Sequence, residues 1–106
     1  MRFSSLGSGS RGNALIVESN QTRILIDCGV TLRALSEGLA RLDLSTESID
    51  AVFITHEHGD HIKGLKSLAR QCSMPLYMTH GTAIKSGLDH LPQMNILSHS
   101  QKIVNL

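Results

Sequence analysis

The stretch that decides the fold of this chain is residues 49–61, which read Ile-Asp-Ala-Val-Phe-Ile-Thr-His-Glu-His-Gly-Asp-His. The first seven residues are mostly apolar, β-branched or aromatic and contain no Pro or Gly, so they predict a buried strand over residues 49–55. The last six hold three imidazoles and an aspartate, all of which can bind metal. Four such side chains at the end of a buried strand predict a preformed site.

The spacing of these side chains indicates how they would bind metal. Side chains alternate in an extended segment, so His56 and His58 point the same way and can bind one ion, while Glu57 points to the other side. The glycine that follows permits a turn, after which Asp60 and His61 can face a second ion. Imidazole and carboxylate ligands without a cysteine are typical of an open site for zinc, manganese or iron.

Two simpler interpretations of the motif compete with a two-metal site. A histidine-rich loop can be a chance surface feature, and four ligands can bind a single structural metal ion. The motif also differs from the zinc-protease motif His-Glu-x-x-His, because Asp60 stands at its fifth position. A His-x-His-x-Asp-His pattern between a hydrophobic strand and a helix nevertheless favours a metal site over a chance surface feature.

The flanking sequence predicts an α/β layered fold. Strands are expected at residues 2–6, 14–19, 23–27, 75–78, 95–97 and 102–106, and helices at residues 31–42, 62–71 and 79–87. Leucines spaced by three, four and three residues mark the buried face of the first helix. Thr79 is the expected cap of the last helix.

Residues 7–12, Gly-Ser-Gly-Ser-Arg-Gly, match the dinucleotide-binding pattern G-x-G-x-x-G, and Asp27 lies twenty residues beyond Gly7. That pattern requires a helix after the third glycine. Residues 14–19 predict a strand instead, so we reject a nucleotide site. The backbone amides of this loop stay candidates for contact with an anionic substrate near the mouth of the site.

Three segments carry a resemblance to a known family. Residues 54–65, Ile-Thr-His-Glu-His-Gly-Asp-His-Ile-Lys-Gly-Leu, resemble the signature of the metallo-β-lactamase superfamily of hydrolases. Residues 24–29 resemble the strand before its first long helix, and residues 5–14 are similar to its small bacterial exonuclease-like members. The resemblance implies that residues 1–106 form one partial domain, the amino-terminal half of the αββα metallo-β-lactamase sandwich, incomplete at the carboxyl end.

The resemblance also implies roles for the motif. His56 and His58 would bind a first divalent ion, and Asp60 and His61 a second, with zinc expected and manganese or iron as alternatives. Asp60 would also help to position the attacking water, which makes it the expected catalytic residue. The later ligands of the family have no recognisable counterpart in this chain.

Two residues beside the motif have expected supporting roles. Asp27 has two interpretations: a structural carboxylate that accepts amide hydrogen bonds in its own turn, or support for a metal-bound histidine. Thr55 is expected to end the strand with its hydroxyl bonded to the turn.

The function implied is metal-dependent hydrolysis by a hydroxide bound to two metal ions, acting on a phosphodiester, with nucleic acid as the expected substrate. The alternative is a truncated, non-catalytic module that binds metal weakly or pairs with another copy, because part of the ligand set is missing. A fragment of a two-sheet fold would expose apolar sheet surface, which predicts a homo-oligomer.

Charge, cysteine content and hydropathy indicate which partners and which cellular compartment to expect. The net charge is +1 and basic residues are scattered, although Lys63, Lys66 and Arg70 share a face of the helix after the motif. We interpret that face as solvated surface, with substrate phosphate contact as the alternative. Cys28 and Cys72 indicate small buried hydrophobes rather than a disulfide framework. No segment predicts a membrane span or a signal peptide, so no membrane contact and a cytoplasmic location are expected.

Overall fold

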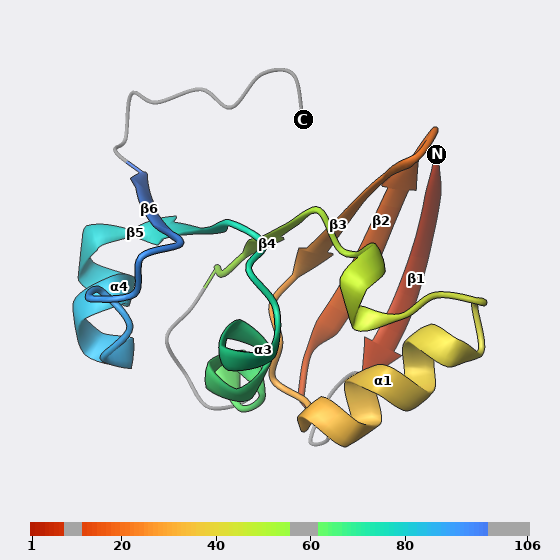
Figure 1. Cartoon of the computed structure of the whole chain (residues 1–106), viewed down its shortest axis with the longest axis horizontal. Coiled ribbons are helices and arrows are strands. Elements are labelled where there is room, and N and C mark those ends of the chain that lie inside the picture. The colour runs from red at the N-terminus through yellow and green to blue at the C-terminus, as the bar shows by residue number, and fades with distance from the viewer. Residues whose placement is uncertain (8–11, 56–61, 98–106) are drawn as a thin grey trace.

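The computed structural model describes residues 1–7, 12–55 and 62–97 of the chain. Within these ranges the chain forms one six-stranded sheet whose strands lie side by side in sequence order (Figure 1). The strands are β1 (Arg2–Gly7), β2 (Ala14–Ser19), β3 (Thr22–Ile26), β4 (Ala51–Phe53), β5 (Leu76–Thr79) and β6 (Met94–Leu97). The helices are α1 (Leu32–Ala40), α3 (Leu65–Gln71) and α4 (His80–Ser86), with a 3-10 turn, η2 (Thr46–Ser48). The predicted α/β class is confirmed.

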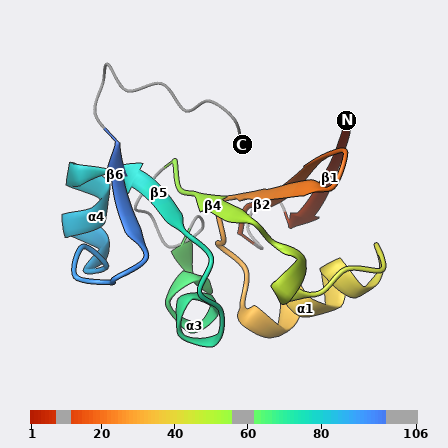
Figure 2. The same ribbon diagram turned by 45° about the horizontal axis from the view of Figure 1, so that its top comes forward.

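The sheet has an antiparallel part and a parallel part. β1, β2 and β3 form an antiparallel meander, whereas β3, β4, β5 and β6 run parallel to one another. Parallel neighbours need a crossover connection, and a helix lies between each successive pair. Figure 2 shows α1 and α3 on the same face of the sheet. The carboxyl ends of β3, β4 and β5 therefore meet at one edge.

Local capping explains where the helices begin and end. Thr31 precedes α1 and its hydroxyl accepts a hydrogen bond from the Ala34 backbone N–H at 3.1 Å. Thr79 caps α4 in the same way, and Gly87 ends α4 with a left-handed φ of 75°. Both helices were expected from the sequence. α3 begins at Leu65 rather than at residue 62, because Gly64 occupies its N-cap position.

The central strand is shorter than the expected residues 49–55. Ile49 belongs to the end of η2, since its backbone N–H donates to the Thr46 carbonyl at 3.2 Å. The ladder continues as far as Ile54, whose N–H donates to the Tyr77 carbonyl at 3.0 Å. Thr55 leaves the sheet because its N–H donates to a side chain instead of to a neighbouring strand.

The two faces of the sheet differ in how much they are covered. The face under the helices is fully buried at Ile16, Leu25, Val52, Leu76 and Met78, which pack with Leu35, Leu39, Leu65 and Leu68. The strand register places on the other face the half-buried side chains Leu15, Val17, Ile24, Ile26, Phe53 and Tyr77, which we call the open face. On it the rings of Phe53 and Tyr77 stack with centroids 4.7 Å apart.

The half-buried apolar side chains of the open face agree with the expectation that this sheet is one half of a two-sheet sandwich. None of the helices in the described ranges is long and apolar enough to cross a bilayer. The cytoplasmic location stays a prediction.

Candidate functional site

The candidate site lies at the carboxyl edge of the parallel strands, where Asp27 follows β3 and Thr55 follows β4. Open α/β sheets bind their ligands at this edge. His56 is the next residue after Thr55 in the sequence. The structure therefore positions the residue from which the motif segment, residues 56–61, departs.

Asp27 binds the end of β4 through its carboxylate. Its Oδ1 accepts a hydrogen bond from the Thr55 backbone N–H at 2.8 Å, and its Oδ2 accepts one from the Thr55 hydroxyl at 2.7 Å. The Asp27 backbone N–H donates to the Phe53 carbonyl at 2.8 Å. Asp27 is only 6% exposed and has a left-handed φ of 64°, a conformation that Asp tolerates better than most residues.

These contacts refine the expectation for both residues. The structural interpretation of Asp27 is confirmed in its chemistry, since the carboxylate accepts an amide hydrogen bond. The amide that donates to Oδ1 belongs to Thr55 at the end of the neighbouring strand, and a bond within the turn of Asp27 itself stays a prediction. The Thr55 hydroxyl was expected to bond to the turn, and the bond that the structure gives is to the Asp27 carboxylate, which follows β3. Support of a metal-bound histidine by Asp27 stays a prediction.

The other end of the motif segment is held by the same loop. The Gly64 backbone N–H donates to the Cys28 carbonyl at 2.9 Å. A Cβ atom at Gly64 would overlap the carbonyl oxygen of Val30, so the two backbones pack closer than any side chain allows. We call residues 27–30 the anchor loop. Described residues on both sides of residues 56–61 are thus bonded to the anchor loop: Thr55 to Asp27 and Gly64 to Cys28.

The anchor loop is itself fixed to the start of β2. The Gly29 N–H donates to the Asn13 carbonyl at 2.8 Å. Gly12 has a φ of 92° and lies against the Gly29 carbonyl, where a Cβ atom would overlap that oxygen. Close backbone contacts therefore hold the anchor loop between β2 and the beginning of α3, together with the buried side chains of Asp27, Cys28 and Val30.

Cys28 does not offer a metal ligand at this edge. Its side chain is fully buried, and burial raises the pKa of the thiol to about 12. The side chain packs in the apolar core instead of facing the edge. The interpretation of Cys28 as a small buried hydrophobe is confirmed.

The predicted ligands His56, His58, Asp60 and His61 lie outside the described residues, so their assignment stays a prediction. Glu57 lies there too. Among the residues that the structure describes, no group of three or more His, Cys, Asp and Glu side chains is arranged to hold a metal ion.

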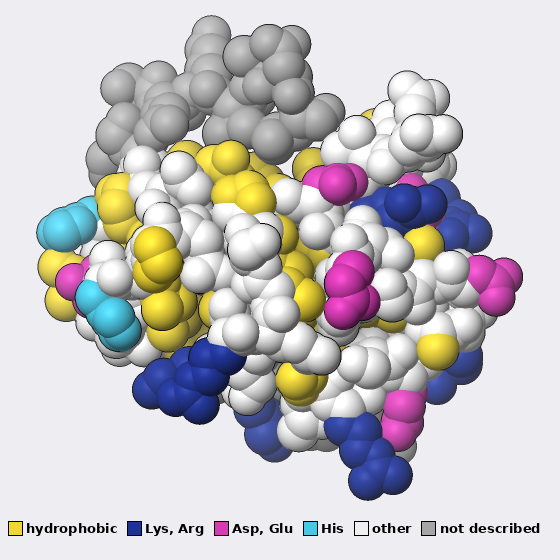
Figure 3. Space-filling view, viewed as in Figure 1, with side chains coloured by type: hydrophobic (Ala, Val, Ile, Leu, Met, Phe, Trp, Pro, Cys, Tyr) yellow, Lys and Arg dark blue, Asp and Glu magenta, His cyan; other side chains and the backbone are white. Residues whose placement is uncertain are grey.

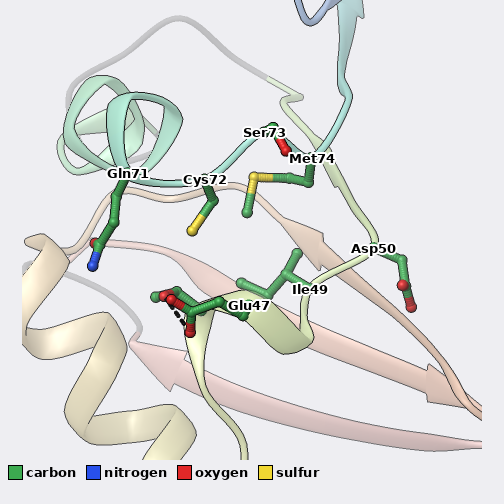
Figure 4. A pocket seen from close by; sticks show the side chains of 8 residues that line it. Glu47, Ile49, Asp50, Gln71, Cys72, Ser73 and Met74 are labelled. Carbon is green, nitrogen blue, oxygen red and sulfur yellow. Dashed lines mark hydrogen bonds between the residues drawn. The ribbon is translucent and has the colours of Figure 1, made fainter.

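Hollows border the sheet at several places. A cavity of about 230 Å³ adjoins Asp27 and is otherwise lined by Ser5, Gly7, Asn13, Ala14, Leu15 and Ile26. One of about 450 Å³ lies between the end of β1, Val30 and α1, and one of about 410 Å³ lies at the amino ends of β4 and β5. Figure 4 shows Glu47 across this hollow from Gln71 and Cys72. The hollow at the amino ends is remote from the strand ends that carry Asp27 and Thr55. Of these hollows, only the one of about 230 Å³ is lined by Asp27, and we place the site there.

Sequence reasoning missed Gly64 as a site residue. A glycine immediately after a metal motif and before a helical pattern is the signal that was available. It indicates a close backbone approach at the helix start.

Comparison with known proteins agrees with this geometry. The family model described as Anti-Pycsar protein Apyc1 matches residues 3–85. The exodeoxyribonuclease WalJ of Streptococcus pneumoniae serotype 2 (strain D39) is 40% identical over 81 residues, covering 76% of this chain and 30% of that protein. The exodeoxyribonuclease YycJ of Bacillus anthracis is 36% identical over 91 residues, covering 86% of this chain and 34% of that protein. The chain thus spans about a third of the length of these curated relatives.

A similar fold occurs in a solved structure of a B3 metallo-β-lactamase with an active-site glutamic acid. The TM-score is 0.73 at 15% identity, over 91% of this chain and 42% of that one. The expected metallo-β-lactamase fold is confirmed, and at the level of the family the relatives support a metal-dependent hydrolase or nuclease. This chain belongs to the Anti-Pycsar protein Apyc1 family, within the metallo-β-lactamase superfamily.

Proposed function

We propose that this chain is the metal-binding amino-terminal part of a metal-dependent hydrolase that cleaves phosphodiester bonds in nucleic acid. The observation that supports this most directly is the anchoring of residues 56–61 at both ends. Thr55 is bonded to Asp27, and Gly64 is bonded to Cys28, the next residue. A segment held in this way can present several ligands to one point, which a free surface loop cannot.

The residues proposed to hold two divalent ions are His56 and His58 for the first and Asp60 and His61 for the second. Their imidazole nitrogens and carboxylate oxygens suit zinc, and the neutral Cys28 thiol introduces no competing thiolate. Proteins of this fold generally bind divalent metals. When bound, such ions lower the pKa of water and stabilise charge on the phosphoryl oxygens.

The protein's own residues supply positioning. Asp27 fixes the backbone and hydroxyl of Thr55, the residue that precedes His56 in the sequence. The Asp60 carboxylate is proposed to accept a hydrogen bond from the attacking water. The water oxygen would bond to phosphorus as the bond to the leaving ester oxygen breaks, and the proton that the water loses would end on the departing oxygen. The exodeoxyribonuclease names of WalJ and YycJ support DNA as the substrate class.

The test combines metal content with hydrolysis. The chain, purified without chelator, should hold two ions by elemental analysis and should hydrolyse bis(4-nitrophenyl) phosphate. His58→Ala should remove metal and activity together. Asp27→Asn should weaken metal binding without changing the circular dichroism spectrum. Asp50→Asn is the matched control, because Asp50 also accepts a backbone N–H, from Arg23 at 2.8 Å, but at the opposite edge. An unchanged metal titration in Asp27→Asn would remove its positioning role.

A second candidate is a non-catalytic module that associates with another copy. The open face favours it, because six half-buried apolar side chains on one sheet surface are an association surface. Absence of metal and of hydrolysis, with a mass that rises with concentration in sedimentation, would support this module. A monomer at high concentration would count against it.

A further inference from the structure

Three basic side chains follow the motif segment in the sequence and have no ion-pair partner among the described residues. Lys63 is in the turn before α3, and Lys66 and Arg70 are one turn apart on α3. All three are exposed, and none makes an ion pair or a side-chain hydrogen bond within the part of the chain that the structure describes. No Asp or Glu occurs anywhere in residues 62–74. We call these three residues the α3 basic stripe.

Several other basic residues of the chain are neutralised by ion pairs. Arg2 and Arg23 both contact the carboxylate of Glu18, and Arg33 contacts that of Glu37 at 3.1 Å. Figure 3 shows Lys and Arg side chains gathered along the edge of the molecule where Figure 1 places α3 and α1. The α3 basic stripe is therefore a local excess of positive charge in a chain of net charge +1.

Helix stability does not explain this arrangement. Lys66 lies in the first turn of α3, where the helix dipole disfavours a positive charge. Lys66 and Arg70 are also like charges at positions i and i+4, which repel each other. Only Arg70, in the last turn, is favourably placed with respect to the dipole.

The stripe also has the length of a short run of phosphates. It begins two residues after the motif segment and continues along the outer side of α3, whose inner side buries Leu65 and Leu68. At 1.5 Å per residue, Lys66 and Arg70 are about 6 Å apart along the helix. One DNA strand carries a phosphate about every 3.4 Å of its axis, so this spacing covers about two phosphate intervals.

We propose that the α3 basic stripe binds the phosphate backbone of the nucleic-acid strand beside the bond that the site cleaves; this inference rests on the proposed function. Contacts to phosphate position a strand without reading its sequence, as a nuclease without sequence preference requires. An anionic membrane is the less suitable partner. The exposed residues of α3 are Lys66, Ser67, Arg70 and Gln71, none of which is apolar enough to insert into lipid.

The test compares two double variants that lose the same charge. Lys66→Gln/Arg70→Gln neutralises the stripe, and Arg33→Gln/Lys85→Gln removes two exposed cations from α1 and α4. Binding of fluorescein-labelled phosphorothioate DNA, which resists cleavage, is followed by anisotropy between about 50 and 200 mM KCl. The stripe variant should bind about tenfold more weakly or worse at low salt. Its salt slope should fall by about 1.4 on single strands and about 1.8 on duplex.

The control variant should bind within about threefold of the parent chain, and circular dichroism should show both variants folded. Hydrolysis of bis(4-nitrophenyl) phosphate should be unchanged in both, since this small substrate does not reach the stripe. Weakened DNA binding by the stripe variant, in a parent chain without hydrolysis, would support the stripe and contradict the hydrolase. Three results would overturn the stripe: equal binding by the stripe variant and the parent, equal losses in both variants, or a parent that binds phosphatidylserine vesicles but not DNA.

Discussion

The two edges of the parallel sheet are built differently. At the carboxyl edge the anchor loop packs against β2 and Gly64 so closely that two glycines face backbone carbonyl oxygens, and the cavity beside Asp27 is about 230 Å³. At the amino edge the chain leaves a hollow of about 410 Å³ between η2 and the end of α3. The edges differ in anchoring and not in volume, because a hollow of about 450 Å³ also lies beside Val30 of the anchor loop.

The largest effect on stability should come from adding one carbon atom at the closely packed carboxyl edge. Gly64→Ala places a Cβ against the Val30 carbonyl oxygen, which belongs to the backbone and cannot rotate away. We expect a loss of about 3 kcal/mol in the free energy of unfolding, measured by urea denaturation. Gly81→Ala on α4 is the control, because nothing lies within 4 Å of its added carbon. It should stabilise the chain by up to about 1 kcal/mol, since Ala favours helix.

If both glycine variants unfold at the same urea concentration as the parent, the carboxyl edge is not tightly packed and the contrast between the edges disappears.

The next effect compares two aspartates that each accept a backbone N–H at opposite edges. Asp27→Ala leaves the Thr55 N–H and hydroxyl without their acceptor, at a position that is 6% exposed. We expect it to cost about 2 kcal/mol of unfolding free energy. Asp50 is exposed and accepts one bond, from Arg23, so Asp50→Ala should cost about 1 kcal/mol or less. Thermal or urea denaturation of both variants measures the difference, and equal losses would contradict a special role for the carboxyl edge.

The smallest expected effect is a difference in thiol reactivity between the two edges, and it is measured on the unmutated chain. Cys28 is fully buried behind the carboxyl edge with a thiol pKa of about 12, so about one molecule in 10⁴ is thiolate at pH 8. Cys72 is half-buried and its side chain lines the hollow at the amino edge (Figure 4). Ellman's reagent should therefore titrate one thiol in the native chain and two in denaturant. Two fast thiols in the native chain would show that the carboxyl edge opens.

Local pattern was sufficient to predict most of the fold. The leucine spacing of α1 and the Thr79 and Gly87 caps of α4 lie within a few residues of the features they determine. The turn η2 was not predicted, because its capping box has an unusual residue. The Ser45 N–H donates to the Ser48 hydroxyl at 3.1 Å, whereas the common capping box has Glu or Gln at that position.

The site was only partly predictable. The motif itself stands in the sequence, but the partner of the Asp27 carboxylate is 28 residues away, at the end of another strand. Which of the two strand ends Asp27 reaches depends on the parallel pairing of β3 with β4, a long-range contact that residue patterns do not encode. The close approach of Gly64 to Val30 depends on tertiary packing in the same way.

The open face has a practical consequence for anyone who handles this chain. Dyes whose fluorescence increases on exposed apolar surface ordinarily report thermal unfolding, because folded proteins bury such surface until they denature. Here the dye should bind the native state, on the stacked Phe53 and Tyr77 rings and the aliphatic side chains of the open face. In a dye-based thermal unfolding assay the fluorescence should be high before heating and should change little on unfolding. Ligand screening of this chain therefore calls for label-free calorimetry.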